Sequence, residues 1–173
     1  MKKVFKAMLA TVALVSISAS ASIAPAYADD LEVVSRAAKG LSSYQVFQGA
    51  GSNLTDGQTL ATKLRGSDLG IVVIPQKEVE SKSAREIASE VRSSPDVEYS
   101  TVIVVLDGPE DVMGVSSSNR EVEDKLVSYL GKDPVRDAGW VLIQNSTKLF
   151  NVEKDLKAEA AKKISDAEDA AKA

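Results

Sequence analysis

The chain has 173 residues, with 21 lysines and arginines against 25 aspartates and glutamates, which gives a net charge of −4 at pH 7. It contains no histidine and no cysteine, which excludes zinc sites of the Cys/His type, cysteine nucleophiles and triads with a histidine base. The acidic balance and the low aromatic content of 5% argue against nucleic acid and anionic membrane surfaces as partners.

Residues 1–28 have the three parts of a secretory signal peptide. These parts are a basic start, an apolar stretch and a cleavage motif: Lys2, Lys3 and Lys6; Ala7–Ile17; and Ala26-Tyr27-Ala28, followed by Asp29. The apolar stretch is shorter than the ~20 residues that a membrane-spanning helix needs. We therefore expect a protein exported to the periplasm, the cell envelope or the medium, without stable membrane insertion once the signal is removed. An uncleaved anchor is the alternative.

Cleavage after Ala28 leaves 145 of the 173 residues, which is enough for one domain with a core that needs no disulfide. Removing three of the 21 basic residues leaves 18 against 25 acidic ones, a net charge of −7. We expect an N-terminal helix and lead-in over residues 29–54, an α/β domain over 55–150 and a charged C-terminal helix over 151–173.

The lead-in begins with a helix over Asp30–Lys39. Asp30 is a candidate N-cap, and Gly40 is a typical residue for the C-terminal stop. Tyr44–Gln48 is expected as a short edge strand or as an extended lead-in to the domain.

Three capping-box patterns then predict the starts of three helices, because a serine or threonine is followed three positions later by glutamine or glutamate. The pairs are Thr55 with Gln58, Ser83 with Glu86, and Ser118 with Glu121. Apolar residues at i, i+4 spacing follow each pair.

Four apolar segments between and after these helices are predicted strands: Leu69–Ile74, Thr101–Leu106, Val112–Val115 and Trp140–Gln144. Their alternation with helices predicts an α/β three-layer sandwich, with a mixed, mostly parallel sheet flanked by helices. The first two segments should be adjacent parallel strands at the sheet centre. A tight turn precedes Val112–Val115, so this strand should pair antiparallel with Thr101–Leu106.

The turn between those two strands is acidic. Asp107, Glu110 and Asp111 offer carboxylate oxygens, the ligands that Ca²⁺ and Mg²⁺ prefer. The alternative is a solvated hairpin in which Gly108-Pro109 makes the bend. A divalent cation at this turn is the only cofactor that the sequence suggests.

A run of serines, Ser116–Ser118, precedes the third helix. A serine nucleophile would need a desolvated lysine as its base, since histidine is absent, and Lys125 is the nearest downstream candidate. Ser118 is also the predicted helix cap, and that structural role explains it without any chemistry.

The last segment, Asn151–Ala173, is rich in Ala, Lys, Glu and Asp. It carries one narrow apolar stripe: Val152, Leu156, Ala160, Ile164, Ala167 and Ala171. One interpretation is a terminal helix that lies on the domain or frays in water. The other is an arm that binds a partner helix, with Leu156 and Ile164 as its largest apolar contacts.

These segments together resemble the TPM domain family, over roughly Thr55–Gln144. The features that carry the resemblance are the helix before LGIVVIP, the Ser83-capped helix, the strand–acidic turn–strand STVIVVLDGPEDVMGV and the closing helix NREVEDKLVSYL. Within that family, the chain is more similar to a mycobacterial and corynebacterial branch of short exported or membrane-tethered proteins. That branch is associated with NlpC/P60-type peptidoglycan hydrolases and cell separation.

The leading hypothesis is an exported, non-catalytic module that binds and regulates a cell-envelope hydrolase. The composition supports its non-catalytic character, and the resemblance implies the hydrolase as its partner. The phosphatase-like members carry an Asp-Asn-Gly-type segment before the strand that corresponds to Thr101–Leu106, where this chain has Asp96-Val97-Glu98-Tyr99-Ser100. A metal-dependent acid phosphatase that uses Asp107, Glu110 and Asp111 is therefore the second hypothesis. A secreted structural protein whose tail binds helical partners is the third.

Overall fold

A computed structural model of the protein describes residues 30–172, and the predicted signal peptide lies outside these residues. The helices are α1 (Asp30–Leu41), α2 (Gly57–Leu64), α3 (Ala84–Arg92), α4 (Arg120–Leu130) and α5 (Ala138–Lys172), with a short 3-10 turn η1 (Gln76–Glu78). The strands are β1 (Val46–Gln48), β2 (Leu69–Pro75), β3 (Thr101–Asp107) and β4 (Val112–Ser117). Within the described range, no helix is long and apolar enough to cross a membrane.

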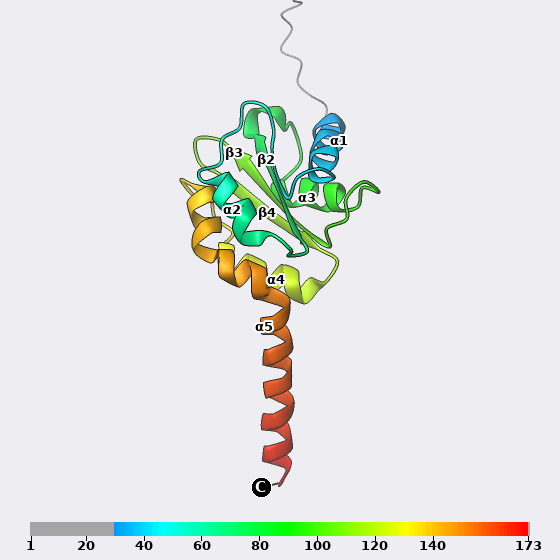
Figure 1. The fold of residues 1–173 in the computed structure, drawn as a ribbon, viewed down its shortest axis with the longest axis vertical. Coiled ribbons are helices and arrows are strands. Elements are labelled where there is room, and N and C mark those ends of the chain that lie inside the picture. Colours follow the sequence, from blue (N-terminus) through cyan, green and yellow to red (C-terminus); the bar gives the residue numbers. More distant parts are fainter. Residues whose placement is uncertain (1–29, 173) are drawn as a thin grey trace, which may run out of the picture.

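The four strands form one mixed sheet in the order β1-β2-β3-β4 (Figure 1). Strand β2 is parallel to both of its neighbours, and its pairing with β3 runs from Leu69↔Thr101 to Pro75↔Asp107. Strand β4 pairs antiparallel with β3. The predicted central pair, the antiparallel hairpin and the predicted edge position of β1 are confirmed.

The side chains of the central strands alternate between two separate cores, one on each face of the sheet. Ile71 and Val73 face a core that includes Leu60 of α2, Leu126 of α4 and Leu142 of α5. On the other face, residues of β2 and β3 pack against α1 and α3: Val72, Ile74, Val102 and Val104. The architecture is therefore the expected three-layer α/β sandwich.

The two parallel connections, β1-α2-β2 and β2-α3-β3, step in the same direction along the sheet. Their helices lie on opposite faces, since α2 belongs to one core and α3 to the other. The two connections are therefore of opposite hand, and one of them is left-handed, which is rare among parallel crossovers.

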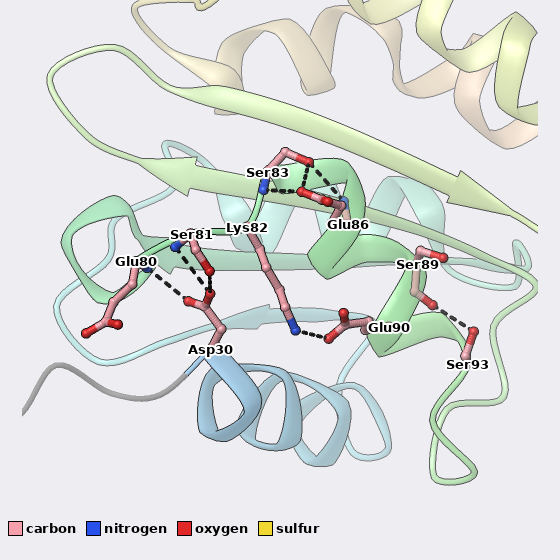
Figure 2. A network of polar contacts seen from close by, with 9 residues as sticks. All are labelled: Asp30, Glu80, Ser81, Lys82, Ser83, Glu86, Ser89, Glu90 and Ser93. Atoms are coloured by element: carbon pink, nitrogen blue, oxygen red, sulfur yellow. Dashed lines mark hydrogen bonds and ion pairs between the residues drawn. The ribbon is translucent and has the colours of Figure 1, made fainter.

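Only one of the three predicted capping boxes forms as expected. The Ser83 hydroxyl accepts the Glu86 N–H, and the Glu86 carboxylate accepts the Ser83 N–H (Figure 2). The Thr55 prediction is wrong, because Asp56 precedes α2 in the left-handed region (φ 56°) and makes no side-chain cap.

The Ser118 prediction is wrong by one residue, because Asn119 caps α4 by accepting the Glu121 N–H at 2.9 Å. Ser118 instead donates its own N–H to the Ser100 carbonyl at 2.9 Å. This bond extends the β3–β4 pairing and delays the start of the helix.

The predicted strand Trp140–Gln144 is also wrong, because these residues lie in α5. Asp137 caps that helix by accepting the Trp140 N–H at 2.9 Å. Buried residues recur with helical spacing at Ala138, Leu142 and Leu149. A run of four apolar residues (140–143) is ambiguous between strand and helix. The Asp137 cap and the longer periodicity decide for helix.

Helix α1 is held on the domain by the buried carboxylate of Asp30 (Figure 2). This group accepts the Glu80 N–H at 2.9 Å, the Ser81 N–H at 3.2 Å and the Ser81 hydroxyl at 2.7 Å. Its partners lie in the loop before α3 and not in its own helix, so the predicted N-cap role of Asp30 is corrected. These bonds, chiefly the one from the Glu80 N–H, lower the pKa of Asp30.

Candidate functional site

The acidic turn lies at the carboxyl ends of β2 and β3, where ligands of parallel α/β sheets commonly bind. A cavity of about 430 Å³ opens there between this turn, the segment after β2 and the loop after β1. Its lining residues are Gly51, Pro75, Gln76, Lys77, Asp107, Gly108 and Pro109. Asp107 is the only predicted metal ligand in this lining.

The three carboxylates of the turn have different environments. Asp107 accepts the N–H of Asn53 at 2.7 Å and so holds the loop after β1. Asp111 is 8% exposed and accepts the Ala138 N–H at 2.8 Å. Glu110 is exposed.

Asp111 therefore caps the start of α5, and its backbone also pairs with Val135 through bonds of 2.7 and 2.9 Å. Across residues 30–172, no three His, Cys, Asp or Glu side chains are grouped so that they could hold a metal ion. The structure thus assigns Asp107 and Asp111 structural contacts and does not bring the three predicted ligands together.

The serine run before α4 is equally occupied by structural contacts. The Ser116 hydroxyl accepts from Arg92 Nε at 3.1 Å, and the Ser117 hydroxyl bonds the Thr101 hydroxyl at 2.8 Å. Lys125, the candidate base, donates to Glu159 at 2.6 Å, and this bond raises the pKa of the lysine. A lysine base needs a lowered pKa, so the arrangement does not favour a Ser–Lys dyad.

The C-terminal part of helix α5 extends away from the domain (Figure 1). We call its distal part, residues 151–172, the arm. Every described arm residue from Lys157 onward is exposed. Of the two predicted binding residues, Leu156 is half-buried and packs on the core, whereas Ile164 is 62% exposed.

A groove of about 600 Å³ runs between the arm and α4. Its floor on the arm consists of Leu156, Ala160 and Ile164, which are consecutive members of the predicted apolar stripe. Its α4 side includes Glu121 and Asp124.

The groove is braced at its inner end by the ion pair between Lys125 of α4 and Glu159 of the arm. The Tyr129 ring lies beneath two ammonium groups, at 5.7 Å from that of Lys125 and 5.4 Å from that of Lys148. Sequence reasoning missed this brace, because nothing in the chain relates Lys125 to a glutamate 34 positions later.

No family model, curated protein or solved structure matches the chain.

Proposed function

We propose that the protein is an exported, non-catalytic module that binds another protein of the cell envelope through the seam of its arm. The seam comprises the exposed stripe residues and Leu156: Leu156, Ala160, Ile164, Ala167 and Ala171. The observation that carries the proposal is the exposure of Ile164, at 62%, on a helix that continues beyond its own domain. A large apolar side chain in that position gains from burial against a partner.

The seam favours a helix as its partner. It is narrow and follows the helix axis, as in helix-in-groove recognition with anchors at i, i+4 spacing. The alanines at 160, 167 and 171 allow a second helix to approach closely, while Leu156 and Ile164 supply the larger contacts.

The charges that border the groove indicate the sequence of the partner helix. Glu121 and Asp124 lie on the α4 side, and Lys163 lies on the arm side. A complementary helix has basic residues along the edge that meets α4 and an acidic residue opposite Lys163. Such complementarity sets specificity and orientation more than affinity.

The export and the type of partner come from the sequence. The signal-like residues 1–28 support an envelope location, and the resemblance to exported TPM proteins supports an NlpC/P60-type peptidoglycan hydrolase as the partner. In this role the protein regulates the hydrolase, and hence cell separation, without chemistry of its own.

A matched pair of substitutions tests the seam. Ile164→Asp places a charge on it and should weaken binding to the hydrolase at least about tenfold, since the charge becomes buried. Ala158→Asp adds the same charge to the face of the arm opposite the seam, and should leave binding unchanged. Ile164 and Ala158 are both exposed in the free protein. Isothermal titration calorimetry with a purified hydrolase from the same organism measures the affinity of both variants.

Removal of residues 157–173 should abolish binding while the domain stays folded, because the buried contacts of α5 end at Val152 and the half-buried Leu156 is retained. Equal binding by the full chain and the shortened chain would overturn the proposal.

A further inference from the structure

The sheet has two edges. Contacts within the protein bound the β4 edge at both of its ends, and a groove of about 740 Å³ lies along the edge between them, lined in part by Met113, Val115 and Ser117. At one end of β4, the backbone of Asp111 pairs with Val135. At the other end, the Glu123 carboxylate accepts the Ser117 N–H at 3.1 Å. Arg85 of α3 reaches Glu123 of α4 at 2.6 Å, and this ion pair crosses the β4 edge because the two helices lie on opposite faces. Such covering is a common protection against unwanted strand pairing.

Within residues 30–172, no comparable hydrogen bond or ion pair crosses the β1 edge. The Ile71 N–H donates to the Gln45 carbonyl, and the Gly49 N–H donates to the Val73 carbonyl. In a parallel ladder, these bonds place the backbone groups of Gln45, Phe47 and Gly49 toward β2. The N–H and C=O groups of Val46 and Gln48 therefore point away from the sheet.

The sequence of this edge also lacks protective features. Residues 43–48 read SYQVFQ and contain no charged residue and no proline. Tyr44 is 65% exposed beside the strand. An uncharged strand with outward backbone groups is complementary to one kind of occupant, another extended chain.

A groove of about 550 Å³ lies between this edge and α2. Its far end is at Gly57, where a Cβ atom would come within 2.4 Å of Gln48 Nε2. At the near end, Gln45 Nε2 donates to the Leu64 carbonyl at 2.7 Å. Helix α2 thus runs antiparallel to β1, and its C-terminal cap Arg65 lies at the Tyr44 end of the groove.

The α2 side of the groove is uncharged except for Arg65. The residues there are Gly57, Gln58, Ala61 and Thr62. No salt bridge of Arg65 is found between residues 30 and 172. On its α2 side, a strand in this groove meets uncharged side chains along its length and the exposed guanidinium of Arg65 at its end.

We propose that the β1 edge binds an extended segment of a partner protein as a fifth strand of the sheet. The segment is uncharged where it follows β1 and carries a carboxylate that meets Arg65. A second copy of this chain is a poor occupant. Its own β1 region offers no acidic side chain for Arg65, and two acidic domains repel each other. This surface is separate from the seam of the arm.

A peptide titration of the ¹⁵N-labelled protein tests the proposal. The probe is an acetylated peptide of alternating valine and threonine. It is made in two forms, one with glutamate at the N-terminal end and one with glutamate at the C-terminal end. One form should shift the amide signals of Val46 and Gln48 and slow their hydrogen exchange. The same peptide N-methylated along its length cannot form the ladder and should bind at least about tenfold more weakly, as should a version with lysine in place of glutamate.

Two variants locate the site on the protein. Val46→Pro removes an outward N–H and leaves the β1–β2 bonds in place, so it should abolish peptide binding. Arg65→Ala should remove the preference for glutamate over lysine and leave the Val46 and Gln48 shifts intact. Removal of residues 157–173 should leave peptide binding unchanged, which would show that the peptide does not bind at the seam of the arm.

Three outcomes of the peptide titration would overturn the proposal. They are equal binding by the N-methylated peptide, shifts at Met113 and Val115 of the β4 edge in place of Val46 and Gln48, and no binding of either peptide at millimolar concentration. Concentration-dependent shifts of Val46 and Gln48 without peptide would identify a second copy as the occupant and would also overturn it.

Discussion

The two halves of α5 have the same secondary structure and opposite relations to the rest of the molecule. Between Ala138 and Val152, the helix buries Leu142 and Leu149 against the sheet and α2. Beyond Leu156, the same helix has no buried residue within the described part of the chain. The first half is held by tertiary packing, whereas the second depends on local helix propensity and on one brace to α4. The first half therefore belongs to the core of the domain, whereas the second half presents its side chains to solvent.

The packed half should be the most sensitive to substitution. Leu142 is fully buried, so Leu142→Ala should lower the free energy of unfolding by about 2–5 kcal/mol. Urea denaturation followed by circular dichroism measures this loss. A loss below about 1 kcal/mol would show that α5 is not part of the domain core.

The start of the packed half depends on the Asp111 cap. Asp111→Ala leaves the Ala138 N–H without its buried acceptor and should cost about 1–3 kcal/mol. The measurement is repeated with millimolar Mg²⁺ and Ca²⁺. A stabilisation by either cation that disappears in Asp111→Ala would indicate that the turn binds metal, and the capping account would then be incomplete.

The ion pair that braces the arm against α4 should respond to pH. The hydrogen bond from Lys125 lowers the pKa of Glu159. The contribution of this carboxylate to stability is therefore complete above its unfolded pKa of 4.5, and it is lost as the pH falls through the lower folded pKa. The pKa of Lys125 is raised by the same bond, so its contribution is lost only as the pH rises beyond 10.5. The brace is therefore closed between these limits.

The NMR signals of the Tyr129 ring should report the opening of the brace in acid. Glu159→Gln should remove the acid transition of these signals. Because both groups face solvent, the effect on stability should be smaller than that of either substitution above. A ring signal that is constant down to the acid unfolding of the domain would contradict the brace.

Substitutions in the exposed half of α5 should hardly change the free energy of unfolding. Ile164→Ala removes an exposed side chain and should change the free energy of unfolding by less than about 0.5 kcal/mol. The same denaturation experiment checks this value beside Leu142→Ala. A larger loss would mean that the arm already folds back on the domain in solution, and the seam would then be covered.

The sequence predicted the central sheet well, because β2 and β3 are continuous apolar runs that are buried on both faces. Ser83 and Glu86 form a capping box because both partners of the pattern belong to one local turn. Such features depend on neighbouring residues only.

The errors occurred where tertiary contacts decided the outcome. Trp140–Gln144 was predicted as a strand although Asp137, three residues earlier, is a local helix cap; the second cap, Asp111, lies 27 positions from Ala138 and is a tertiary contact. Ser118 lost its cap role to Asn119 because the β3–β4 ladder extends to Ser100. The brace and the open β1 edge depend on contacts between distant segments, which the local sequence does not contain.

The spacing of the arm seam has a consequence for the geometry of any helix that binds it. Leu156 and Ala167 are eleven residues apart, and so are Ala160 and Ala171. Eleven residues in three turns is 3.67 residues per turn, slightly more than the 3.6 of a straight α-helix and unlike the 3.5 of a heptad. Two helices joined along such a seam wind around each other with a shallow right-handed twist. A partner with a heptad repeat would drift out of register along the arm, whereas one with an eleven-residue repeat would stay in contact over its whole length.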